Sequence, residues 1–80
     1  MLELLLVEDN ARLRPALKAG LDATGEIRVV HDCDTGEAAL AYCLDTPPQV
    51  ILMDVHLASA MNGIEAAVAI RRECPVAGGF

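Results

Sequence analysis

Hydrophobic and polar residues follow one another along this chain in a pattern that occurs three times: a short, mostly apolar run, then a segment with helical spacing. The apolar runs are Leu2–Val7, Ile27–Val30 and Val50–Met53. Runs of this length bounded by polar residues are typical of strands that are buried on both faces of a sheet. Strands that alternate with helices through short links build a parallel sheet with helices on both of its sides. The sequence therefore predicts an α/β fold.

The segment after the first run predicts a helix that Asn10 can cap and Gly25 can end. Its apolar face consists of Leu13, Leu17 and Leu21. Pro15 has no backbone N–H, so inside a helix it removes a hydrogen bond. We therefore expect this helix either to begin later than Asn10 or to be bent in its first turns.

The two later helices are marked by their caps. Asp34 and Glu37 have the spacing of a capping box, and Asn62 and Glu65 repeat it. The buried face of the second helix is expected to consist of Ala39, Leu40, Cys43 and Leu44. One face of the third helix carries Ile64, Ala67, Val68 and Arg71.

Composition narrows the classes of protein that fit this pattern. The chain has 80 residues, of which 54% are hydrophobic, so it is expected to be one domain and is too apolar to be disordered. Six basic and twelve acidic residues give a net charge of −6, which disfavours binding to nucleic acid. The longest uninterrupted apolar stretch, Ala38–Leu44, is far shorter than the roughly 20 residues that a membrane span needs.

Other sites and locations are disfavoured by the same sequence. Three cysteines without a C-x-x-C pair argue against a disulfide framework. A secretory signal has basic residues before its apolar run, and none precedes the first apolar run here. We therefore expect a cytoplasmic protein. His31, Cys33 and Cys43 lack a convincing fourth ligand for a soft metal. No phosphate-binding glycine loop and no nucleophile elbow occurs. The sequence also offers too few functional groups for a small metal-dependent hydrolase.

Acidic residues directly follow two of the predicted strands. Glu8 and Asp9 end the first strand, and Asp54 ends the third. Ligands of an open parallel sheet bind beyond the carboxyl ends of its strands, where the strand order reverses. If these two strands are neighbours, three carboxylates converge there, and a hard cation such as Mg²⁺ would relieve their repulsion. The alternative is that they are ordinary solvated acids at strand ends.

Three motifs around these acids resemble the CheY-like receiver domain of bacterial response regulators. Leu5–Asn10 resembles the acidic motif of that family, Val50–Asp54 its phosphoacceptor strand, and Met61–Ala66 the segment that opens its third helix. The motifs occur in the family's order and spacing, and the resemblance extends from Leu2 to about Val76. It implies a three-layer α/β fold with strand order 2-1-3, a C-terminally truncated form of the flavodoxin-like receiver fold.

The resemblance also implies a function in two-component signal transduction. Asp54 would accept a phosphoryl group from a sensor histidine kinase. Asp9 would bind Mg²⁺ directly, Glu8 would bind it through water or as a secondary ligand, and the backbone carbonyl of His56 would complete the protein's ligands. The family is a set of phosphorylated signalling domains, so the chain itself is not expected to be an enzyme. Ala58 stands where many relatives carry proline, which indicates a subtype of this loop.

The resemblance covers three strand–helix units of the family's five. Residues 1–76 are expected to form this receiver domain, and 77–80 a short tail too rich in glycine for a fourth strand. The family's switch Ser/Thr and its phosphate-pairing Lys have no counterpart here, since the single lysine, Lys18, belongs to the first helix. We expect a truncated or incompletely recorded receiver that leaves its third strand at a sheet edge. Such an edge favours a homodimer by edge-to-edge pairing or strand exchange, and the alternative function is a dimerisation or interaction module that no longer signals.

Overall fold

The structure, a computed structural model, describes residues 1–53, 62–74 and 78–79 of the chain. Its elements are β1 (Leu2–Val7), α1 (Leu13–Ala23), β2 (Ile27–Cys33), α2 (Gly36–Asp45), β3 (Val50–Met53), α3 (Gly63–Glu73) and β4 (Gly78–Gly79). Strands and helices alternate, as the apolar runs predict. Among the described residues, no helix is long and apolar enough to cross a membrane.

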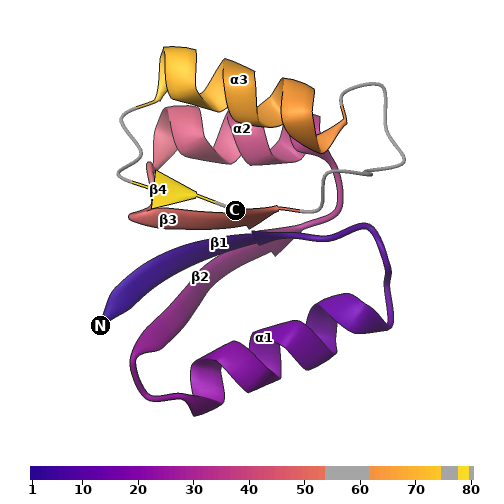
Figure 1. The fold of residues 1–80 in the computed structure, drawn as a ribbon, viewed down its shortest axis with the longest axis vertical. Coiled ribbons are helices and arrows are strands. Elements are labelled where there is room, and N and C mark those ends of the chain that lie inside the picture. Colours follow the sequence, from indigo (N-terminus) through magenta and orange to yellow (C-terminus); the bar gives the residue numbers. More distant parts are fainter. Residues whose placement is uncertain (54–61, 75–77, 80) are drawn as a thin grey trace.

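β1 lies between β2 and β3 in one parallel sheet with the order β2-β1-β3-β4 (Figure 1). Leu4 of β1 pairs with Val50 of β3, and Val7 pairs with Met53. The carboxyl ends of these two strands therefore lie at the same edge of the sheet. The predicted order 2-1-3 is confirmed.

Two strands differ from what the sequence pattern predicts. β2 continues past Val30 to Cys33, because the backbone of its polar residues still pairs with β1. Gly78–Gly79 forms β4, which pairs with the first half of β3, so the prediction that this tail is no strand is wrong. Strand pairing needs only backbone N–H and C=O groups, which glycine has. Because β4 pairs with Val50 and Ile51, the prediction that the third strand lies at the sheet edge is wrong for this half of β3.

Helices cover the two faces of the sheet unequally: α1 lies on one face, while α2 and α3 lie side by side on the other (Figure 1). Successive strand residues point to opposite faces, so Leu5 and Val7 pack toward α2 and α3 while Leu4 and Leu6 pack toward α1. The larger core cluster consists of Leu5, Val7, Ala39, Cys43, Ile51, Met53, Ala66, Ile70 and Cys74. On the α1 side the helix has no fully buried residue. That side of the core is the thinner one.

The start of α1 shows why the helix tolerates Pro15. The side chain of Asn10 accepts hydrogen bonds from the backbone N–H groups of Arg12 and Leu13, at 2.9 and 3.0 Å. The helix begins only at Leu13, so Pro15 stands in its first turn. The first N–H groups of a helix have no partner within it, so proline costs no hydrogen bond there. The prediction that the helix begins later than Asn10 is confirmed.

The ends and faces of the other two helices are partly as predicted. Asn62 and Glu65 form the capping box of α3. In α2, however, the cap is Thr35, whose hydroxyl accepts from the N–H of Ala38 at 3.1 Å, and Asp34 is not the cap. The observed cap thus lies one residue after the predicted one. The buried residues of α2 are Gly36, Ala39 and Cys43. Leu44 is exposed, contrary to the prediction.

The buried side of α3 is not the face that its larger apolar residues suggest. Gly63, Ala66 and Ile70 are buried, whereas Ile64 is 62% exposed and Val68 is 52% exposed. α3 packs beside α2, and Ala66 and Ile70 belong to the same core cluster as Ala39 and Cys43 of α2.

Candidate functional site

The acidic pair continues directly from the carboxyl end of β1. The N–H of Glu8 donates to the carbonyl of Cys33 at 3.0 Å, so the backbone of β1 remains tied to the end of β2 beyond the strand itself. The residue is only 9% exposed, and its Oε1 accepts from the N–H of Asn10 at 3.1 Å. Asp9, which follows, is half-buried. Both carboxylates thus stand on a backbone fixed by the sheet and by the turn into α1.

Arg14 holds the same turn from the helix side. Its Nη1 donates to the carbonyl oxygen of Glu8 at 2.9 Å, and its Nε pairs with Oδ2 of Asp32 at 3.2 Å. Its own N–H donates to the carbonyl of Asn10 at 2.9 Å. Sequence reasoning missed this residue, because a side chain that binds a backbone carbonyl leaves no motif.

The third predicted acid, Asp54, follows the neighbouring strand β3 in the sequence. Val7 pairs with Met53, and the residues that follow these two in the sequence are Glu8 and Asp54. The adjacency of β1 and β3 on which the predicted site depends is confirmed. Asp54 and His56 lie outside the described residues, so their places in the site remain predictions.

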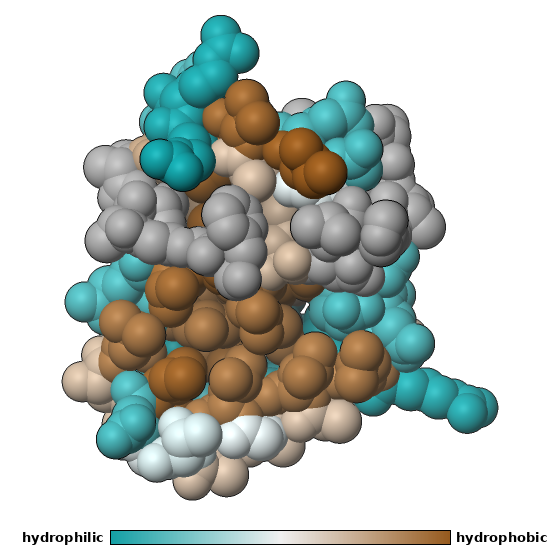
Figure 2. All heavy atoms as spheres, in the orientation of Figure 1, coloured by the Kyte–Doolittle hydropathy of each residue, from teal (hydrophilic) through white to brown (hydrophobic). Residues whose placement is uncertain are grey.

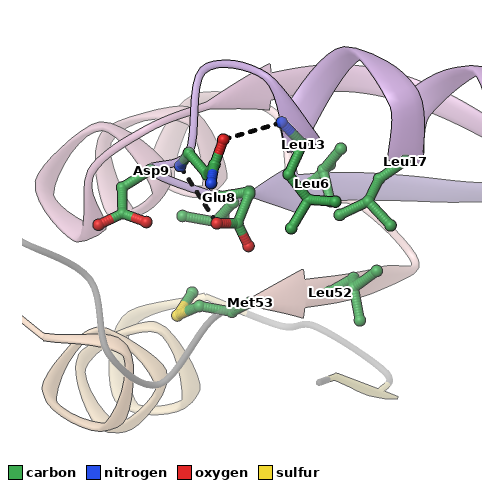
Figure 3. A pocket seen from close by; sticks show the side chains of 9 residues that line it. Leu6, Glu8, Asp9, Leu13, Leu17, Leu52 and Met53 are labelled. Carbon is green, nitrogen blue, oxygen red and sulfur yellow. Dashed lines mark hydrogen bonds between the residues drawn. The ribbon is translucent and has the colours of Figure 1, made fainter.

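A groove of about 600 Å³ opens beside the acidic pair (Figure 3). Its lining residues are Leu6, Val7, Glu8, Asp9, Asn10, Leu13, Leu17, Leu52 and Met53. In Figure 3, the leucines of α1, β1 and β3 point into one space, and the Glu8 carboxylate lies on the side of β1 that faces Met53. Figure 2 shows apolar side chains gathered over the sheet and α1 in this region. The groove is therefore acidic at the end formed by Glu8 and Asp9 and apolar along its leucines.

The donor chemistry at this end fits a hard cation. Mg²⁺ prefers oxygen ligands and commonly takes one or two carboxylates together with several waters. A carboxylate offers about four acceptor positions, and hydrogen bonds among the described residues use one of those of Glu8. Within the described part of the chain, no group of three or more His, Cys, Asp or Glu side chains is placed to hold a metal. The described residues thus supply two of the predicted ligands, Glu8 and Asp9.

The residues considered for a soft metal are engaged in packing. The ring of His31 stacks on Tyr42 with 4.4 Å between ring centroids and 5° between planes. The thiol of Cys33 donates to the carbonyl of Thr35 at 3.8 Å. Burial raises the pKa of the Cys33 and Cys43 thiols to about 11, so both are protonated near neutral pH. A metal-binding cysteine needs its thiolate form.

Comparisons with known proteins agree with this architecture. The sequence profile of the response regulator receiver domain matches residues 4–77. The transcriptional regulatory protein LiaR of Bacillus subtilis is 36% identical over 73 residues, which are 91% of this chain and 34% of LiaR. A protein-glutamate methylesterase/protein-glutamine glutaminase of Thermotoga maritima is 32% identical over 75 residues, 94% of this chain and 22% of that protein. The chain thus spans about a third or less of these relatives.

Solved receiver structures have the same fold. The response regulator domain of Thermotoga maritima CheB superimposes with a TM-score of 0.87 at 32% identity, covering 95% of this chain and 56% of that one. The signal receiver domain of NarL from Mycobacterium tuberculosis gives a TM-score of 0.85 at 26% identity, covering 96% and 60%. Fold and sequence profile lead to one conclusion: the chain belongs to the response regulator receiver domain family.

Proposed function

We propose that this chain is the phosphoacceptor receiver of a two-component signalling system, in which Asp54 takes a phosphoryl group from a sensor histidine kinase. The observation that carries the proposal is the parallel register of β1 and β3, with Val7 beside Met53. This register supports the proposal because Glu8 and Asp54 are the residues that follow Val7 and Met53 in the sequence. Membership of the receiver family supports it independently.

The proposed site divides the work among four residues. A carboxylate oxygen of Asp54 attacks the phosphorus atom while the bond from phosphorus to the kinase's histidine nitrogen breaks. Glu8, Asp9, Asp54 and the backbone carbonyl of His56 would hold Mg²⁺, which neutralises negative charge around the transferring group. The burial of Glu8 and the hydrogen bond it accepts from Asn10 support a fixed carboxylate at this position.

In this proposal the receiver is modified by its partner and is not itself an enzyme. Two of the relatives are named as methylesterases, and this chain spans only about a fifth of each of them. The proposal therefore does not extend that activity to this chain. A cytoplasmic location is part of the proposal, because a receiver must meet the phosphorylated domain of its kinase.

A mass measurement tests the proposal directly. The chain is incubated with Mg²⁺ and acetyl phosphate, and its intact mass is followed over time. We expect one added phosphoryl group in the wild type, the same uptake in Asp45→Asn and none in Asp54→Asn, because Asp45 lies at the far end of α2. Uptake that persists in Asp54→Asn, or that does not depend on Mg²⁺, would contradict the proposal.

A second candidate function, a dimerisation or interaction module that no longer signals, is favoured by the open apolar groove between α1 and β3. Edge-to-edge pairing through β3 is limited by β4, which already occupies Val50 and Ile51. Light scattering across a range of concentrations separates the two functions. A concentration-dependent dimer without phosphoryl uptake favours the module, and a monomer that takes up phosphate contradicts it.

A further inference from the structure

Arg14 connects three parts of the structure at the acidic end of β1. From the first turn of α1, its guanidinium reaches the carbonyl oxygen of Glu8 and the carboxylate of Asp32 near the end of β2, at 2.9 and 3.2 Å. The Arg14 side chain is 22% exposed and that of Asp32 37% exposed. A guanidinium is planar and rigid, so it can serve two acceptors in one fixed geometry.

The bonded carbonyl is part of the peptide group that joins Glu8 to Asp9. Both carboxylates of the acidic pair project from the residues on either side of this peptide. The peptides on either side of it are tied as well, because the N–H of Glu8 donates to the carbonyl of Cys33 and the N–H of Asn10 donates to the Glu8 carboxylate. Those two hydrogen bonds are made by the backbone or by Glu8 itself. Arg14 can be changed by substitution while both acids stay in place.

Charge and geometry predict opposite effects of Arg14 on a cation at this site. A positive charge beside the acidic pair repels a divalent cation, so through charge alone its removal would tighten binding. If Arg14 instead fixes the Glu8–Asp9 peptide, its removal lets the two carboxylates reorient and weakens binding. The sign of the change therefore tells one role from the other.

An ordinary ion pair elsewhere in the sheet offers a matched control. Nη2 of Arg28 in β2 pairs with Oε2 of Glu3 in β1 at 3.1 Å, with both side chains more exposed than Arg14. This pair joins the same two strands near their opposite ends and involves side chains only. Exposed pairs of this kind contribute little to stability.

We propose that Arg14 is a positioning residue of the acidic pair, which holds the Glu8–Asp9 peptide so that both carboxylates face a divalent cation. The inference rests on the proposed function for the identity of the cation. The order of the peptide itself can be measured without any metal.

Mg²⁺ affinity is measured by titration calorimetry on the full chain and on the variants Arg14→Lys, Arg14→Met and Arg28→Met. We expect the dissociation constant to rise about three- to tenfold in both Arg14 variants, the range of one lost hydrogen bond. Lysine keeps the charge, but its ammonium is a single point donor that cannot reproduce the planar fork. Arg28→Met should change the constant less than about twofold. Melting temperatures of the four proteins show that each is folded.

Amide hydrogen exchange without metal is the second readout. We expect the Asn10 N–H, which donates to the Glu8 carboxylate, to exchange faster in both Arg14 variants and unchanged in Arg28→Met. Unchanged or tighter Mg²⁺ binding in the Arg14 variants would overturn the inference, as would unchanged exchange. If the wild type binds no Mg²⁺, the proposed metal role fails, and the exchange rates still decide whether Arg14 orders the peptide.

Discussion

Asp22 shows how one carboxylate can join two elements. It lies near the end of α1, and its Oδ1 accepts a hydrogen bond from the N–H of Val29 in β2 at 2.9 Å. Lys18, one turn earlier, is 3.4 Å from its other oxygen. The hydrogen bond from Val29 lowers the pKa of Asp22 below its ordinary value of 3.8, and Lys18 adds a smaller contribution. The ionised form is therefore favoured in the folded chain.

This shift predicts a dependence of stability on pH. Because the pKa is lower in the folded chain, the stabilisation is fully present above 3.8 and is lost as pH falls through the lower folded value. We expect the difference in melting temperature between wild type and Asp22→Asn to be constant near neutral pH and to shrink below about pH 4. Thermal unfolding at a series of pH values measures it. Two curves that stay parallel into the acid range would contradict the assignment.

At the same scale, the acids of the candidate site could be predicted and the residue that orients them could not. Glu8 and Asp9 directly follow an apolar run, so the sequence places them at a strand end. Arg14 is one of several charged residues on a helix. Its role depends on the distance between α1 and the turn before it, which no local pattern encodes.

At the scale of elements, α3 shows why periodicity alone cannot choose a buried face. Ile64 and Val68 are four residues apart, and so are Ala66 and Ile70. Both pairs satisfy helical spacing, and the first has the larger side chains. The structure buries the second pair, since α3 packs beside the small residues of α2. Tertiary contact decided between two faces that the sequence leaves equivalent.

The buried face of α3 predicts that two substitutions in this helix change the free energy of unfolding by different amounts. Ile70 is 2% exposed in the core, so Ile70→Ala should lower the free energy of unfolding by about 2–5 kcal/mol. Val68→Ala, on the exposed side of the same helix, should change it by less than about 0.5 kcal/mol. Denaturant unfolding of both variants measures the difference. Similar losses in the two would mean that α3 is rotated relative to this description.

At the scale of the whole molecule, the alternation of apolar runs and helical segments predicted a parallel sheet with helices on both sides, and the resemblance to receiver domains implied the strand order 2-1-3. Three strands and three helices with short links allow few arrangements, because parallel crossovers are right-handed. β4 could not be predicted, since two glycines carry no hydrophobic pattern. The groove between α1 and β3 could not be predicted either, because it depends on how far one helix extends over the sheet.

The proposed phosphoacceptor function requires Asp54 and the acidic pair to meet at one edge of this sheet around a divalent cation. Replacing Mg²⁺ with paramagnetic Mn²⁺ and recording which backbone amide signals broaden in a nuclear magnetic resonance spectrum tests this most directly. We predict that substoichiometric Mn²⁺ broadens the signals of Glu8, Asp9 and Asp54 together and leaves those of α1's far end, around Ala23, sharp. Broadening at the acidic pair without Asp54, or centred on Asp32 and Asp34 instead, would contradict it.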